Sequence, residues 1–254
     1  MGIISAVFDY TFREHLRHKV WLSCVLFGLV MVLGALVVSA LASDERARVL
    51  LDLGLAANEV IAMVSIVFLT VHLILQEIES RAVFLILTHP VKRSHYLLGR
   101  FLGTLAAVGL AMAAMGLAHW LLLKLLGWNG DGSYLLAWSC SFAKTAVMGA
   151  LALLLSLTLT SEAAAMAFAV FFWVLGHFSA EMRFLGKKSG NALLGAGLTA
   201  FSNIAPDFTH FNYRDAWHAG APEAGWAAWG AIYALAYCGA CLALATQVFD
   251  QKEF

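Results

Sequence analysis

Long apolar runs, separated by short charged or glycine-rich segments, make up most of this chain. Six of the runs approach the roughly 20 apolar residues that an α-helix needs to cross a bilayer. They cover residues 20–41, 60–75, 101–126, 134–159, 163–178 and 226–245. The pattern therefore predicts an all-α polytopic membrane protein with six transmembrane helices, folded as a single domain over residues 1–254.

The N-terminal segment, residues 2–19, has a different pattern. Apolar residues such as Val7 and Phe8 recur near one helical face, whereas Glu14 lies elsewhere. This distribution is typical of an amphipathic helix at the membrane interface. The run that follows, 20–41, is longer than the roughly 7–15 apolar residues of a signal peptide, so we expect a span there rather than a cleaved leader.

Two segments interrupt the apolar pattern. Residues 76–100 carry charges at both ends of a short apolar block, and Pro90 lacks the N–H that a continuing helix needs. We therefore predict a short helix, a turn and a new helix start there. Within residues 179–223, the apolar stretch 191–205 would extend only about 22 Å as a helix, less than a bilayer core of roughly 30 Å. We expect it to be re-entrant or interfacial, within a cap on the outer side.

Cationic side chains predict the orientation, because Lys and Arg concentrate in cytoplasmic loops. With a cytoplasmic N-terminus, the inner segments hold Arg13, Arg17, Lys19, Arg81, Lys92, Arg93, Arg100 and Lys252. The short outer loops hold only Arg46 and Arg48. We therefore expect both termini in the cytoplasm, whereas a crossing by residues 191–205 would put the C-terminus outside.

Composition agrees with lipid as the surrounding solvent. Of the residues, 61% are hydrophobic and only 13% are charged, with a mean hydropathy of +0.80. An ordinary soluble domain is about one quarter charged. The formal net charge is zero, which gives no reason to expect nucleic acid as a partner. The four cysteines lie in apolar segments, where a thiol packs as a small hydrophobic group.

The sequence lacks the common motifs of nucleotide and metal chemistry. Residues 186–188, Gly-Lys-Lys, lack both the upstream glycine and the Ser or Thr of a P-loop. H-E-x-x-H, G-x-S-x-G and a spaced Cys/His quartet are also absent. His15 and His18 lie three residues apart in a basic segment, which favours a solvated face over a metal site. We predict no catalytic residue, cofactor or metal, and no ATP hydrolysis by this chain.

Three charged residues are candidates for function. Lys144 lies inside a predicted span, where an ionisable side chain is costly enough to suggest a role. It lines a transport path, or it snorkels or pairs with a neighbour such as Ser141 or Thr145. Glu77 and Glu79 follow the second span and form a solvated helix end or a docking surface for a cytoplasmic partner, rather than an acid–base pair.

The third predicted span and the turn after it carry packing and interface signals. Three glycines in this span, as in close helix contacts within lipid, are Gly103, Gly109 and Gly116. His119 and Lys124 are interpreted as interface anchors near the outer boundary. An aromatic belt is predicted at the same boundary from Trp120, Trp128, Tyr134 and Trp138.

The stretch EIESRAVFLILTHPVKRSHYLLGRFLG, residues 77–103, resembles the segment after the second helix of ABC-2 type transporter permeases. An E-x-E pair, an apolar block, Pro, Arg and Tyr-Leu-Leu-Gly-Lys/Arg-Phe-Leu-Gly recur there. Residues 203–215, NIAPDFTHFNYRD, look like the Pro-then-Phe-Asn stretch of these permeases. Arg81 departs from the pattern, because many relatives have Gly nearby. The chain looks most like the subgroup for maturation of copper enzymes such as nitrous oxide reductase.

The resemblance implies a permease subunit of an ABC exporter in the cell inner membrane. A second protomer, expected to be an identical chain, would complete the pore, and two copies of a separate cytoplasmic ATPase would drive it. A coupling helix would contain the docking residues Glu77, Glu79, Arg81, Pro90 and Arg93. Lys144 would line the path, and an outer gate would contain Pro206, Phe211 and Asn212. The alternative is a membrane scaffold or assembly factor for another enzyme, or an intramembrane enzyme. Lipid, peptide, drug and sulfur species all remain open as cargo.

Overall fold

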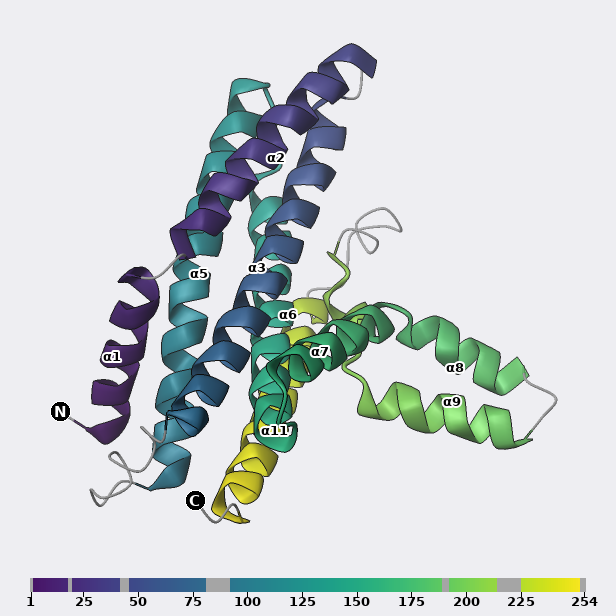
Figure 1. The fold of residues 1–254 in the computed structure, drawn as a ribbon. Helices are drawn as coiled ribbons and strands as arrows, with labels where there is room; N and C mark the ends of the chain where they lie inside the picture. The colour runs from purple at the N-terminus through teal and green to yellow at the C-terminus, as the bar shows by residue number, and fades with distance from the viewer. Residues whose placement is uncertain are drawn as a thin grey trace.

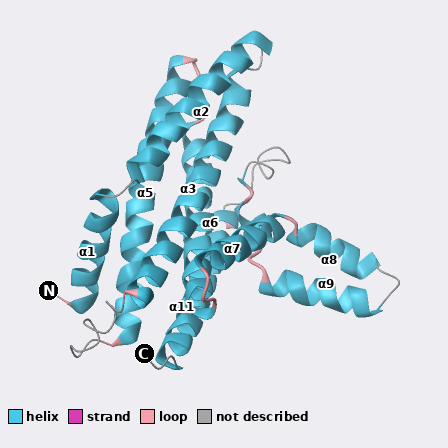
Figure 2. Cartoon of the chain, in the orientation of Figure 1, coloured by secondary structure: helices cyan, strands magenta, loops and turns pink. Residues whose placement is uncertain are grey.

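The fold is built from helices, as Figure 2 shows for the described residues. A computed structural model describes residues 2–17, 20–41, 46–80, 92–188, 192–213 and 225–251. Its helices are α1 (Ile3–Arg17), α2 (Val20–Leu41), α3 (Arg46–Glu79), α5 (Arg93–Leu125), α6 (Asp131–Thr158), α7 (Glu162–His177), α8 (Ser179–Lys188), α9 (Ala192–Ile204), the 3₁₀ turn η1 (Phe208–Phe211) and α11 (Trp226–Gln251).

Four helices, α3, α5, α6 and α11, are each long and apolar enough to cross a membrane. The number rises to six if the bent pairs α1–α2 and α7–α8 each form one span. The chain is thus an all-α polytopic membrane protein, and the predicted fold class is confirmed. With 13 residues, α9 is too short to cross alone.

The helices form an upright bundle with a lateral hairpin (Figure 1). Helix α3 packs against α2, α5 and α6, while α11 packs against α6 in the half of the bundle that carries both chain termini. Helices α8 and α9 pack against each other and project sideways, because the chain bends by 66° between α7 and α8. The end of the bundle that carries the termini is called the terminal end below, and the other the distal end.

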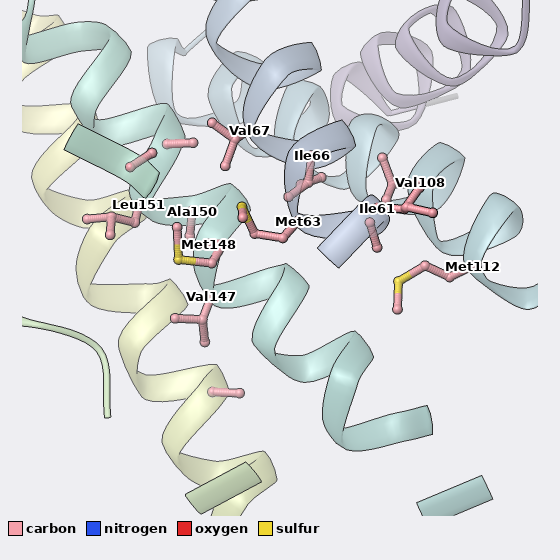
Figure 3. Packing of buried hydrophobic residues seen from close by; sticks show 14 of the residues in the cluster. Ile61, Met63, Ile66, Val67, Val108, Met112, Val147, Met148, Ala150 and Leu151 are labelled. Atoms are coloured by element: carbon pink, nitrogen blue, oxygen red, sulfur yellow. The ribbon is translucent and has the colours of Figure 1, made fainter. Parts of the chain in front are cut away.

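Buried apolar side chains from α3, α5 and α6 meet in the middle of the bundle (Figure 3). Ile66 of α3, Met112 of α5 and Val147 and Met148 of α6 have no exposed surface. In lipid, burying such groups gains little hydrophobic energy, so close packing has to hold the helices together.

Helices α3 and α5 start well before the corresponding predicted spans. Helix α3 begins at Arg46 rather than near residue 60, because the polar residues Asn58 and Glu59 are accommodated inside the bundle instead of ending the span. Helix α5 begins at Arg93, inside residues 76–100 where a new helix start is predicted, and continues into the third predicted span. Its first turns can carry Arg100 because this side chain is bonded within the protein. Helix α2, Val20–Leu41, has the bounds predicted for the first span.

The interpretation of His119 as an interface anchor is also wrong. His119 is only 1% exposed and lies between α3 and α6, 3.1 Å from the Leu50 carbonyl oxygen and 3.1 Å from the Tyr134 hydroxyl. Tyr134 is buried as well, and donates to the Gly116 carbonyl at 2.8 Å. These two residues therefore tie three helices together at the distal end.

Glycines on α5 allow α1 to pack closely against it. A Cβ atom on Gly103 would lie 2.6 Å from the Cβ atom of Thr11 and 2.9 Å from the Phe8 carbonyl oxygen. Gly99 makes a similar approach to Val7. The amphipathic helix is therefore fixed along the first turns of α5, and the predicted role of Gly103 in helix contact is confirmed.

We expect Gly103→Ala to destabilise the protein by about 1–3 kcal/mol, because the added methyl group overpacks the α1–α5 contact. Gly28→Ala is the matched control, since no other group lies within 4 Å of a Cβ atom there. The control should be neutral or stabilised by up to about 1 kcal/mol through helix propensity. Thermal unfolding of the purified protein in detergent measures both, and equal melting temperatures for the two variants would contradict the close contact.

Candidate functional site

A buried ion pair joins α3 to α6 in the interior of the bundle. The Lys144 ammonium nitrogen lies 2.9 Å from Oε1 of Glu59. Both side chains are almost inaccessible, at 3% for Lys144 and 6% for Glu59. An isolated charge in such surroundings costs several kcal/mol, so each group makes the burial of the other possible.

Polar groups from three further positions surround the pair. The Ser141 hydroxyl donates to the second Glu59 oxygen at 3.3 Å, and the Lys144 ammonium donates to Asn212 Oδ1 at 3.5 Å. His177, the last residue of α7, places Nε2 3.4 Å from Glu59 Oε1. The predicted path residue Lys144 and the predicted gate residue Asn212 are thus neighbours.

The positions of these residues follow from helix periodicity. Glu59 lies about 20 Å along α3 from its start and about 30 Å from its end, at the 1.5 Å rise per residue of a helix. Residues 48, 52, 55 and 59 recur at the three- and four-residue spacing that places side chains on one helical face. On α6, residues 133, 137, 141 and 144 have the same spacing. Two facing stripes therefore carry the polar groups.

A cavity of about 490 Å³ opens between these stripes toward the distal end. It is lined by Arg48, Leu51, Asp52, Leu55, Trp128, Gly130, Ser133, Tyr134, Ala137 and Tyr213. A second, much smaller void of about 10 Å³ lies beside the ion pair, and Leu55, Ala137 and Tyr213 line both spaces. The ion pair therefore lies at the closed end of the cavity.

The segment around η1 covers this closed end. Phe211 and Asn212 line the small void with Tyr213, and Phe211 is buried. Pro206 is also buried, and its carbonyl oxygen would lie 2.6 Å from a Cβ atom on Gly176 near the end of α7. The three predicted gate residues thus lie in one short segment, but only Phe211 and Asn212 reach the void.

Asp207 holds this segment to α8 and α11. Its carboxylate accepts hydrogen bonds from Ser179 Oγ at 2.6 Å and Thr209 Oγ1 at 2.6 Å, and pairs with Arg183 at 2.6 Å. Its backbone N–H donates to the Tyr233 hydroxyl at 2.7 Å. Burial by itself raises the pKa of Asp207, but the hydrogen bonds outweigh burial and hold this pKa below its ordinary value of 3.8.

A second buried charge network lies at the terminal end, around Arg100. Its guanidinium donates to Glu77, to Glu14 at 3.0 Å and to Thr11 at 3.0 Å. The Tyr96 hydroxyl also donates to Glu77. Arg100 is 3% exposed, so the network fixes α1, α3 and α5 together where the segment 81–91 leaves α3.

The structure separates the residues predicted to dock an ATPase. Glu77 points into the Arg100 network, whereas Glu79 is exposed. Arg93 donates to the Phe249 carbonyl and lies 3.8 Å from the Asp250 carboxylate, so it binds the end of α11. Arg81 and Pro90 lie outside the described residues.

Sequence reasoning missed Glu59, His177 and Arg100 as members of these networks. For Glu59 the available signal was a carboxylate near an apolar run, opposite in charge to Lys144 in another run. For Arg100 the available signal was its position in the interrupted segment 76–100. Glu77 lies at one end of this segment, and Tyr96 and Arg100 lie at the other. The proximity of α7 to α3 that brings His177 to Glu59 has no such signal.

The comparison with known families now decides the class of protein. Residues 54–246, from the α3 half that contains Glu59 to the end region of α11, match the family model of the ABC-2 family transporter protein. The chain belongs to the ABC-2 transporter family. No curated protein matches it.

The family places the chain as the transmembrane permease component of an ABC transporter. Such a permease implies an ABC ATPase as partner, and the family is not itself catalytic. The matched range contains both networks except Glu14 and Thr11 of α1. The buried ion pair is thus a feature of the transporter domain of this permease.

We expect Glu59→Met or Lys144→Met alone to destabilise the permease by about 3–5 kcal/mol, because each leaves the other charge buried without its partner. The double variant, with Met at both positions, should be more stable than either single variant, since an apolar pair needs no compensation. Thermal unfolding in detergent gives the comparison. Losses that simply add in the double variant would show that the two side chains do not interact.

We expect Asp207→Asn to destabilise the permease by about 1.5–3 kcal/mol at neutral pH, as for hydrogen bonds to a charged group. Because its pKa is lower in the folded state, Asp207 stabilises the fold above its ordinary pKa, and this contribution is lost as the pH falls through the folded value. The difference from the natural protein should stay constant between pH 5 and 7 and shrink below the ordinary value of 3.8. Melting temperatures across this range measure it, and a difference that grows on acidification would contradict the assignment.

Proposed function

We propose that this permease forms the membrane path of an ABC exporter, with the Glu59–Lys144 pair as the closed barrier of that path. The observation that carries the proposal is the position of the pair at the bottom of a cavity that opens at the distal end. Intramembrane charges facing a cavity are typical of substrate or ion pathways.

The proposed barrier has parts on three elements. Glu59 belongs to α3, Lys144 to α6, and Asn212 to the segment after η1. Separation of α3 from α6 would break the 2.9 Å contact and join the small void to the large cavity. The predicted role of Lys144 in a path, and of Phe211 and Asn212 in a gate, is retained in this form.

The drive would come from a separate cytoplasmic ATPase that docks at the terminal end. Exposed Glu79 and the segment 81–91, with Arg81 and Pro90, are proposed to form the docking surface. Glu77 and Arg93 are proposed to act from within, because they link this surface to α5 and α11. Movement of the docked segment would thereby reach α1, α3, α5 and α11 together.

A complete transporter would contain two permease protomers and two ATPase copies in the cell inner membrane. Both termini would be cytoplasmic, since they lie at the same end of the bundle as the C-terminal end of α3 (Figure 1), where Glu79 is the last helical residue. Positively charged Arg13 and Arg17 near this end fit the cytoplasmic side. The distal cavity would then face the outer compartment, as an exporter requires for release.

The proposal is tested by labelling Ser141→Cys with a water-soluble thiol reagent, after replacing the four native cysteines by alanine. The void beside Ser141 holds about 10 Å³, too small for the reagent, so the resting permease should react slowly. In membranes that also contain the partner ATPase, ATP should raise the labelling rate several-fold as the barrier opens. Glu79→Lys should abolish this rise without lowering the melting temperature.

Two matched variants make the result specific. Ser156→Cys is also on α6 and fully buried but lines neither space, so its labelling should not respond to ATP. Lys187→Glu reverses an exposed charge on the lateral hairpin and should leave the ATP response intact. Equal labelling of Ser141→Cys with and without ATP, while ATP is hydrolysed, would refute the path.

A further inference from the structure

The cavity between α3 and α6 carries charges of both signs in equal number. Arg48 and Asp52 line its wide part, and Glu59 and Lys144 lie at its closed end. The formal charges of the described lining residues therefore sum to zero. Exposure falls along this series, from exposed Arg48 through half-buried Asp52 to the buried pair.

The two charge pairs repeat one arrangement at two depths. Arg48 and Asp52 are one helical turn apart on α3, a spacing that puts their Cβ atoms about 5–6 Å from each other. Farther in, the ammonium and carboxylate of Lys144 and Glu59 are 2.9 Å apart. A ligand that carries one positive and one negative group on a compact head could therefore meet the same chemistry at the mouth and at the barrier.

Aromatic rings form much of the remaining wall. Trp128, Tyr134 and Tyr213 line the wide cavity, and the first two pack edge to face with ring centroids 6.1 Å apart. Aromatic faces attract ammonium groups, and quaternary ammonium groups in particular, through cation–π interactions. Arg48 supplies the fork of donors that suits a phosphate or carboxylate. The volume of about 490 Å³ lies within the range of small-molecule sites, about 300–1,000 Å³.

Resting on the transport path proposed above, we propose that this cavity binds a zwitterion, a head group with an ammonium next to a phosphate or carboxylate. A ligand with net charge would gain from one member of each pair and be repelled by the other. A zwitterion satisfies both members and adds no net charge to a low-dielectric site. The shared chemistry fits a free small zwitterion and the head group of a zwitterionic phospholipid.

Titration calorimetry on the purified permease tests the proposal with four probes. Dihexanoylphosphatidylcholine and glycerophosphocholine carry the same zwitterionic head with and without acyl chains, dihexanoylphosphatidylglycerol is anionic, and choline is cationic. Binding of both zwitterions supports the proposal with a free head group as sufficient ligand. Binding of the zwitterionic lipid alone supports it with the lipid as source. Equal or tighter binding of the anionic or cationic probe, or no binding of any probe, overturns it.

Two variants at the mouth make the test sharper. Asp52→Asn should weaken binding of the zwitterion by about tenfold and shift the ligand preference toward the anionic lipid. Arg48→Gln should also weaken binding of the zwitterion, but shift the ligand preference toward choline. Lys187→Gln, outside the cavity, is the control and should change neither. An unchanged preference in a variant that keeps its melting temperature would overturn the proposal. Calorimetry needs neither ATP nor the ATPase, so the two proposals can fail separately. Zwitterion binding can be absent while ATP-dependent labelling of Ser141→Cys still supports the path, and the zwitterion can bind while ATP leaves the labelling unchanged.

Discussion

A carboxylate and an ammonium inside a lipid-embedded bundle have to be paired, and the contact between Glu59 and Lys144 meets this constraint. It sets the register of α3 against α6, since sliding either helix by one turn would leave both charges without partners. Neighbouring polar groups gather around it: Ser141 donates to Glu59, Asn212 accepts from Lys144, and His177 brings the end of α7 close to Glu59. The cavity lies between the same two helix stripes, beyond this contact toward the distal end.

The Arg100 network answers the same constraint at the terminal end. There the buried guanidinium meets two carboxylates, Glu14 and Glu77, and the network joins three helices rather than two. Between the two networks the core of the bundle is mainly apolar and buried, so we expect α3 to act as a stiff connection from Glu59 to Glu77. A push on the proposed docking segment would therefore be transmitted along α3 to the proposed barrier, because close-packed interiors transmit strain.

The class of fold follows directly from local pattern. The apolar run at 20–41 gives α2 with its observed ends, since nothing polar in that run requires a partner elsewhere. The shortness of the stretch at 191–205 likewise excludes a simple crossing by α9. The motif at 77–103 is local as well, so the resemblance to ABC-2 permeases, now confirmed by the family match, could be recognised without any coordinates.

The candidate site depended on tertiary structure. Lys144 stands out in the sequence because a charge within an apolar run is costly, but its partner lies in another helix and so could not be inferred from the run itself. Glu59 lies just before the predicted span 60–75, and the packing of α6 against α3 makes its carboxylate acceptable inside the bundle. The sequence around Glu77 predicts a solvated or docking residue, whereas in the fold Glu77 lies beside Arg100 and Tyr96 of α5. The sequence by itself determined the helices and the family, because periodicity and motifs are local; the fold decided which charges meet, because pairing depends on residues far apart in the chain.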